Sequence, residues 1–205
     1  MAYYEKARNE TKKQIQNAFW HYYQKYNYQN SISIKELTSY AGINRSTFYF
    51  YYHNTAEVLE DLISWLKSEI VDIYASQTRY EGDFNSFYKE MYAHFRKRKE
   101  YLIPLVCESR HPEFALWYRN NQRERFKEDV GLHHYRTDPL KNRIIDISLS
   151  GIIEEQIQTF AYGILTVDES FYLEYGMLQK GLIKTLADQF AITCHSELLM
   201  NDSAL

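Results

Sequence analysis

The chain has 205 residues and a formal net charge of −3, with 45% hydrophobic residues but only 7 Gly and 3 Pro. So few helix breakers over this length favour an all-helical (all-α) globular protein. The longest apolar runs, such as residues 101–107, are too short to cross a bilayer, and the N-terminal residues lack the apolar core of a signal peptide. We therefore expect a cytoplasmic protein with no membrane partner.

Charge is distributed unevenly along the chain. Residues 1–55 carry seven Lys or Arg and three Asp or Glu, whereas the remaining 150 residues carry 17 basic and 24 acidic side chains. A basic N-terminal segment on an acidic body favours contact between that segment and a polyanion.

The first predicted helix covers residues 5–27. Apolar side chains recur there at spacings of three and four, which is the helical period. The residues of this stripe are Ile15, Ala18, Phe19, Tyr22 and Tyr26. Asn and Ser at residues 27–31 favour a turn that ends the helix.

A short second helix follows, and its two ends are well marked in the sequence. Ser33 and Glu36 have the spacing of a capping box, in which each side chain bonds to the other residue's backbone N–H. Ile34, Leu37 and Ala41 form its apolar face. Gly42 supplies the stop because glycine tolerates positive φ.

The third helix is predicted over residues 45–51, with Asn44 as its N-cap. It contains most of an aromatic block, residues 48–52. Phe48 and Tyr52 are four apart and should face inward together, while Tyr49 and Phe50 point elsewhere. Residues 45–47 then form an exposed first turn. Two short helices joined by a tight turn have the outline of a helix-turn-helix.

The rest of the chain is predicted to be helical as well. Asn54 and Glu57 open a long helix over residues 54–78. An apolar stripe marks a helix around residues 84–95, and first-turn prolines, Pro112 and Pro139, start helices over 112–131 and 139–163. A capping box at Thr166 and Glu169 opens a helix to about residue 190. The last two helices are apolar over wide arcs, which fits either a monomer core or a dimer interface.

Residues 33–62, SIKELTSYAGINRSTFYFYYHNTAEVLEDL, resemble the DNA-binding segment of TetR-family transcriptional regulators. The resemblance covers about residues 10–60 and rests on motifs that agree in order and spacing: the capped helix, the turn at residues 41–43 and the recognition-helix signature at residues 47–49. Two positions depart from the family pattern, since Thr55 stands where a Lys is common and Ser46 where Gly or Pro is common.

The resemblance implies a set of DNA contacts. Carried over by position, Ser33, Tyr49 and Thr55 would hold phosphates, while Lys35, Arg45, Ser46 and Thr47 would face bases; Asn44 and Phe50 belong to the same surface. Arg45 is the strongest candidate for reading sequence, because a guanidinium can bind O6 and N7 of guanine together.

The resemblance also implies the rest of the mechanism. Residues 1–53 would form the DNA-binding domain, and residues 54–205 a helical effector-binding and dimerisation domain whose ligand-binding residues the sequence does not name. A homodimer would bind a pseudo-palindromic double-stranded DNA operator as a repressor. A small apolar effector in the second domain would then tilt the linking helix and release the DNA.

Other patterns carry less weight. The basic run at residues 96–99 is typical of a solvated helix end. Cys107 and Cys194 lack CxxC spacing and are expected to be reduced thiols. The histidines lack metal-ligand spacing, with Cys107, His111 and the pair at residues 133–134 as the only loose candidates, so we predict no metal and no cofactor. No catalytic motif is present, and we predict that the chain is not an enzyme. Two alternative functions compete with that of a DNA-binding regulator. One is a co-regulator of the same fold that binds a partner protein, and the other is a helical enzyme with its site in residues 54–205.

Overall fold

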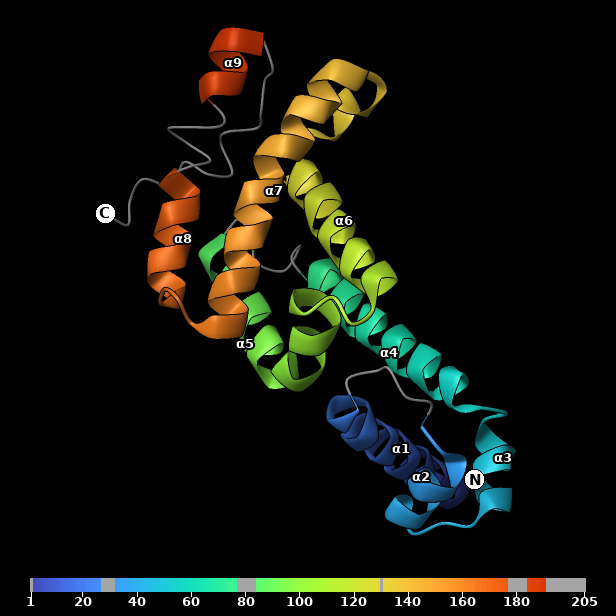
Figure 1. Cartoon of the computed structure of the whole chain (residues 1–205). Helices are drawn as coiled ribbons and strands as arrows, with labels where there is room; N and C mark the ends of the chain where they lie inside the picture. The colour runs from blue at the N-terminus through green and yellow to red at the C-terminus, as the bar shows by residue number, and fades with distance from the viewer. Residues whose placement is uncertain (1, 27–31, 77–83, 130, 177–183, 191–205) are drawn as a thin grey trace. The chain divides into compact units, whose positions relative to one another are not determined.

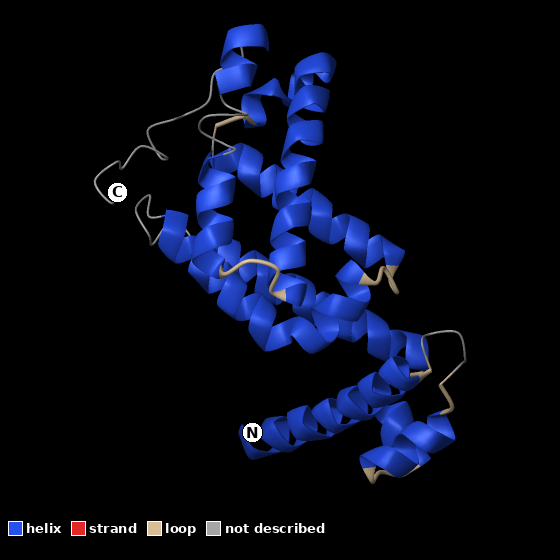
Figure 2. Cartoon of the chain, turned by 60° about the vertical axis from the view of Figure 1, so that its left-hand side comes forward, coloured by secondary structure: helices blue, strands red, loops and turns tan. Residues whose placement is uncertain are grey.

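The computed structural model describes residues 2–26, 32–76, 84–129, 131–176 and 184–190. These residues are mostly helical, with short loops and no strand among them (Figure 2), which confirms the predicted all-α class. The chain divides into two compact units, Met1–Asp72 and Ile73–Leu205. The first unit therefore includes most of the long helix that the sequence assigned to the second domain. No helix in the described part of the chain is both long and apolar enough to cross a membrane.

The first unit contains α1 (Ala2–Lys25), α2 (Ile34–Ala41), α3 (Arg45–Tyr51) and the first part of α4 (Thr55–Ser76) (Figure 1). Helix α2 packs against α1 and is followed directly by α3. Their apolar faces meet in one core, whose buried members include Ile15, Phe19, Tyr23, Leu37, Phe48, Leu62 and Leu66. Of the stripe predicted for α1, Ile15, Ala18 and Phe19 are buried, while Tyr22 and Tyr26 are only half-buried.

Local capping fixes where α2 ends and α3 begins. Gly42 has φ +67°, and its N–H donates to the Ser39 carbonyl while that of Ile43 donates to the Thr38 carbonyl. These bonds close α2 in the left-handed turn that glycine favours. Asn44 then caps α3, because its Oδ1 accepts from the N–H of Thr47 at 2.7 Å. Gly42 and Asn44 therefore have their predicted roles.

The capping box predicted at the start of α2 is wrong. Ser33 occupies the N-cap position with extended backbone, but its side chain makes no capping hydrogen bond. The helix still starts there, because the N–H of Leu37 donates to the Ser33 carbonyl and the Leu37 side chain is fully buried. Ser33 and Glu36 are both exposed, so water can satisfy the first-turn N–H groups without them.

The start of α4 does have the predicted reciprocal pattern, shifted by one residue. The N–H of Glu57 donates to Asn54 Oδ1 at 3.0 Å. The Glu57 carboxylate reaches back to the backbone N–H of His53 at 2.8 Å, not to that of Asn54. These bonds fix the turn that connects α3 to α4.

The second unit is built around one helix, α7 (Pro139–Tyr162). It contacts α5 (Phe84–Leu102), α6 (Pro112–Asp129) and α8 (Val167–Gly176), as well as a π-helical turn, η2 (Ile103–Cys107), and a 3-10 turn, η3 (His133–Thr137). Both first-turn prolines stand where the sequence placed them. The π-helical turn was not predicted; in it the N–H of Glu108 bonds to the carbonyl of Ile103, five residues back.

The Thr166–Glu169 capping box forms as predicted and opens α8, which is described up to Gly176. The predicted continuation to residue 190 is described only as α9 (Lys184–Phe190), and residues 177–183 lie outside the described part of the chain. Of the stripe at residues 84–95, Phe95 is buried and Tyr92 is half-buried, while the side chains of residues 84–88 are not described.

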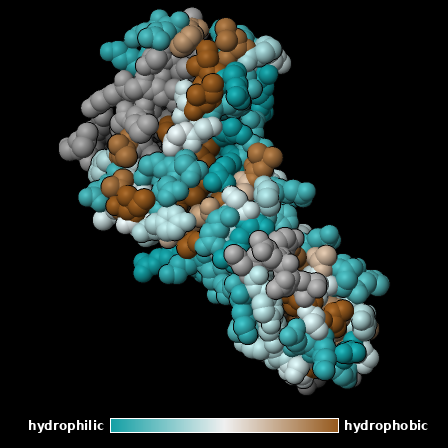
Figure 3. All heavy atoms as spheres, in the orientation of Figure 1, coloured by the Kyte–Doolittle hydropathy of each residue, from teal (hydrophilic) through white to brown (hydrophobic). Residues whose placement is uncertain are grey.

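Most of the wide apolar arc of α7 is core. Ile145, Leu149, Ile152, Ile153, Ile157 and Phe160 are all buried within the second unit. Ile147, by contrast, is 62% exposed, and Leu140 and Tyr162 near the two ends of the helix are also exposed. On the face of the molecule shown in Figure 3, brown apolar spheres lie among the teal polar ones. The monomer core therefore accounts for much, but not all, of the arc.

Candidate nucleic-acid interface

Helix α3 presents two contrasting faces. Phe48 is fully buried and Tyr52, its C-cap residue, is nearly so, with their ring centroids 6.0 Å apart. Tyr49 and Phe50 are 54% and 70% exposed. The aromatic block is thus divided as the sequence predicted, with residues 48 and 52 as anchors and residues 49 and 50 on the outer surface. An exposed aromatic face on a short helix is available to a partner.

The first turn of α3 is organised by one side-chain oxygen. Asn44 Oδ1 accepts from the backbone N–H of Thr47, from Thr47 Oγ1 at 2.8 Å and from Ser46 Oγ at 2.6 Å. Both hydroxyl hydrogens therefore point at the cap. Their oxygens keep lone pairs, so in this arrangement Ser46 and Thr47 offer acceptors, not donors, to a ligand. Acceptors of this kind suit the amino groups of adenine or cytosine.

Two cations accompany this turn. Arg45 is the first residue of α3 and Lys35 lies in the first turn of α2, and both side chains are exposed. Among the described residues, none forms an ion pair with either of them. A guanidinium at a helix N-terminus gains nothing from the helix dipole, which favours negative charge there. Both charges are therefore available to an external anion or base edge.

The remaining predicted contacts lie at the margins of this surface. Ser33 precedes α2 and keeps an exposed hydroxyl that does not cap the helix. Thr55 is half-buried at the first position of α4. The backbone N–H and ring of His53 hold the pKa of Glu57 below its usual value, so a carboxylate stands two residues from Thr55. A phosphate at Thr55 would meet that negative charge, which makes this contact weaker than the resemblance implies.

A polar cluster behind α3 was missed by the sequence analysis. Asp61 of α4 accepts from the Tyr52 hydroxyl at 2.7 Å, from Gln16 Nε2 at 2.7 Å and from Lys12 Nζ at 2.8 Å. One carboxylate thereby joins α1, the end of α3 and α4. A buried tyrosine needs a partner for its hydroxyl, and that requirement was the available hint.

The two acidic groups of this cluster have shifted pKa values. Burial raises the pKa of Asp61, but the hydrogen bonds from Lys12, Tyr52 and Gln16 and the charge of Lys12 outweigh it, and the net shift is downward. Burial and the hydrogen bond to Asp61 raise the pKa of Tyr52. Asp61 is therefore ionised and Tyr52 is a hydrogen-bond donor at neutral pH.

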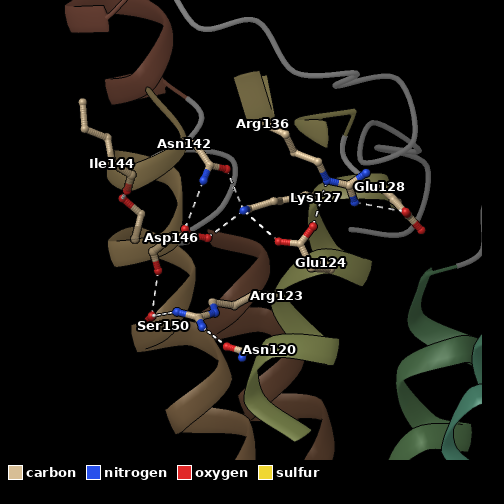
Figure 4. Close-up of polar contacts among 11 residues, drawn as sticks. Asn120, Arg123, Glu124, Lys127, Glu128, Arg136, Asn142, Ile144, Asp146 and Ser150 are labelled. Atoms are coloured by element: carbon tan, nitrogen blue, oxygen red, sulfur yellow. Dashed lines mark hydrogen bonds and ion pairs between the residues drawn. The ribbon is translucent and has the colours of Figure 1, made fainter. Parts of the chain in front are cut away.

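The second unit holds a different polar cluster, drawn in Figure 4. The Lys127 side chain on α6 is only 1% exposed, and its Nζ lies 2.7 Å from Asp146 Oδ1, 2.8 Å from Asn142 Oδ1 and 2.9 Å from Glu124 Oε1. Arg136 of η3 bonds to the other oxygen of Glu124 at 2.8 Å. All three ammonium hydrogens of Lys127 have an acceptor. The cluster thus joins α6, η3 and α7 and has no vacant position for a ligand.

Cys107 and the histidines do not assemble into a site. Burial raises the pKa of the Cys107 thiol to about 11, so it is protonated and a poor nucleophile at neutral pH. Beside it, Arg119 bonds to Glu154 and to the carbonyl of Val106. The histidine pair, His133 and His134, lies on η3. Within the described residues, no three His, Cys, Asp or Glu side chains are grouped to hold a metal ion.

Comparison of the chain with protein-family models, with curated proteins and with solved structures found no match.

Proposed function

We propose that this chain is a DNA-binding transcriptional regulator and that α2, the turn at residues 42–44 and α3 are its helix-turn-helix. The observation that carries the proposal is the outer face of α3, where a capped first turn exposes Arg45 and Ser46 beside the exposed rings of Tyr49 and Phe50. An α-helix that projects such residues from its first turn matches the way a recognition helix enters a major groove.

Each residue type on this face suits one part of a DNA duplex. The Arg45 guanidinium suits O6 and N7 of guanine, and the Phe50 ring suits the methyl group of thymine. Tyr49, Ser33 and Thr55 have hydroxyl groups that suit phosphate oxygens, which fix the register of the protein without reading sequence. The net positive charge of residues 1–55 would add attraction that depends on salt concentration.

The proposed regulator acts as a homodimer and is released by an effector in the second unit. Exposed apolar side chains on α7 and α8, among them Ile147, Tyr172 and Leu173, support the dimer, since a partner chain would remove them from water. Two recognition helices related by a two-fold axis would meet half-sites about 34–36 Å apart on one side of the duplex. Repression by occupying a pseudo-palindromic operator is the mode we favour.

Fluorescence anisotropy with DNA fragments from upstream of the coding sequence tests this proposal. We expect tight, fragment-selective binding that weakens as salt rises. Arg45→Ala should weaken binding to the preferred fragment by about 1–3 kcal/mol, while binding to other fragments changes far less. Arg96→Ala is the matched control, because it removes the same exposed side chain from α5 of the second unit.

Equal, weak binding to every fragment, unchanged by Arg45→Ala, would overturn the proposal. The co-regulator hypothesis would then take its place, with the outer face of α3 contacting a protein partner.

A further inference from the structure

The recognition helix has few means of holding its own direction. Helix α3 has only seven residues, and Phe48 is the single buried one within it. Helices this short are unstable alone, because the cost of the first turn exceeds what so few hydrogen bonds return. The orientation of α3 therefore depends on the side chains that attach it to the rest of the first unit, of which Phe48 and the C-cap residue Tyr52 are the most deeply buried.

These two anchors differ in kind. Phe48 contributes apolar burial, which is not directional, so it holds the helix in place without fixing its angle. Tyr52 is buried too, but its hydroxyl also donates to Asp61 Oδ2 at 2.7 Å. A hydrogen bond to a carboxylate is short, directional and stronger than a neutral one. Of the two, only the Tyr52 contact can define how the end of α3 lies against α4.

Asp61 is itself held from the other side. Lys12 Nζ lies within 2.9 Å of both Asp61 oxygens, and Gln16 Nε2 donates to Oδ2 at 2.7 Å. Gln16 also lies 3.4 Å from the Tyr52 hydroxyl. Since Lys12 and Gln16 are one turn apart on α1, the carboxylate of α4 cannot move far without breaking contacts to α1. The tyrosine hydroxyl is thus attached to a fixed point.

We propose that Asp61 is a positioning residue that sets the direction of α3 through the Tyr52 hydroxyl, and that this bond determines how well the regulator distinguishes its operator from other DNA. The DNA part of this inference rests on the proposed function, whereas the restraint on α3 stands without it.

The two classes of DNA contact should respond differently to a loosened helix. Base-edge hydrogen bonds need donor and acceptor within about 2.7–3.2 Å, so a small pivot of α3 breaks them. Attraction of Lys and Arg side chains to phosphates is long-ranged and tolerates such a pivot. Loss of the Tyr52 hydroxyl should therefore reduce discrimination between DNA sequences more than it reduces general affinity. A purely stabilising role would lower the thermal midpoint and leave discrimination unchanged.

Tyr52→Phe in the full-length chain tests the inference, because it keeps the buried ring and removes only the hydroxyl. Tyr51→Phe is the matched control, since it deletes a hydroxyl from the neighbouring residue of the same helix. Gln16→Leu is a second variant that loosens Asp61 from the α1 side. Two measurements are made on each folded variant: the ratio of affinities for the preferred fragment and a scrambled one, and the rate of amide hydrogen exchange across residues 45–52.

We expect Tyr52→Phe to lower the affinity ratio about five- to tenfold, with scrambled-DNA affinity within about twofold of wild type. Exchange across residues 45–52 should accelerate relative to the α1 amides, and Tyr51→Phe should match wild type in both measurements. Gln16→Leu should shift both in the same direction as Tyr52→Phe, by less.

Unchanged exchange and an unchanged ratio in Tyr52→Phe would overturn the positioning role while leaving the proposed function intact. If instead the wild-type chain shows no preference among fragments, the proposed function fails. In that case the amide hydrogen exchange of Tyr52→Phe across residues 45–52 still shows whether the hydroxyl restrains α3.

Discussion

The first turn of α3 and the junction between α6 and α7 use their basic side chains in opposite ways. Arg45 and Lys35 are exposed and have no ion-pair partner among the described residues. Lys127 is almost entirely buried, and every hydrogen of its ammonium group meets an oxygen of the same unit. A cation whose hydrogen bonds are all made within the fold has none left to offer a ligand. Exposed cations beside a capped helix start are what an anionic partner requires.

The number of Lys and Arg residues in a unit does not by itself indicate an anion-binding surface, because such cations can be paired with carboxylates of the same unit. The second unit contains more Lys and Arg than the first, and several of them are paired with carboxylates, as at Arg119 with Glu154 and Arg136 with Glu124 and Glu128. In the first unit Lys12 is paired in this way, through Asp61. The cations of the proposed DNA surface are Lys35 and Arg45, which are exposed on α2 and α3.

The largest effect on stability is expected at Lys127, because its buried ammonium group bonds only to groups of the same unit. Lys127→Ala should lower the free energy of unfolding by about 3 kcal/mol, because Asp146 loses its cation in a mostly buried site. DNA affinity per folded molecule should not change. Urea unfolding followed by circular dichroism measures the loss. Lys97→Ala, which removes an exposed lysine from α5, should stay within about 0.5 kcal/mol of wild type. A loss below about 1 kcal/mol for Lys127→Ala would contradict the structural role of this cluster.

The two N-cap residues of the first unit offer a second, smaller contrast. Asn44→Ala removes an oxygen that accepts three hydrogen bonds and should cost about 1 kcal/mol. Ser33→Ala removes a side chain that makes no capping bond and should cost less than about 0.5 kcal/mol. Thermal unfolding of both variants gives the comparison. An equal loss of stability in the two variants would contradict the finding that a side chain caps α3 but not α2.

The smallest expected effect is a change in how the thermal midpoint depends on pH. The pKa of Asp61 is lower in the folded chain than its ordinary value near 4, so its contribution to stability is complete above that value and is lost as pH falls through the folded pKa. Tyr52, which donates to it and whose pKa is raised, keeps its proton throughout this range. Asp61→Asn should therefore show a shallower fall in thermal midpoint than wild type between about pH 5 and pH 3. Asp72→Asn, at an exposed position on α4, should retain the wild-type profile.

Local sequence rules predicted the parts of this fold that depend on neighbouring residues. Gly42 and Asn44 act within one helical turn. Pro112 and Pro139 each start a helix because the proline ring fixes φ near its helical value and the first turn does not need the missing N–H. The spacing of Phe48 and Tyr52 was enough to divide the aromatic block into a buried and an exposed face. These features form as predicted because the surrounding structure agrees with the local preference.

The features that sequence analysis missed depend on contacts between distant residues. Asp61 lies 45 residues from Gln16, and Lys127 lies 19 residues from Asp146, so no local pattern marks either cluster. The π-helical turn that ends α5 has its Pro104 and Val106 buried, which is a tertiary effect. The Ser33 capping box failed for the opposite reason, since an exposed helix start needs no side chain when water is available.

Selection from a random pool of double-stranded DNA tests the central claim most directly, because it finds a preferred sequence without assuming one. Full-length wild type and Arg45→Ala would each be used to enrich binding sequences. We predict that wild type enriches an inverted repeat with half-sites about one helical turn apart, and that Arg45→Ala flattens the preference at one symmetric guanine pair. Enrichment of no common sequence by wild type, or of the same motif by both proteins, would contradict the assignment of α3 as the helix that reads DNA.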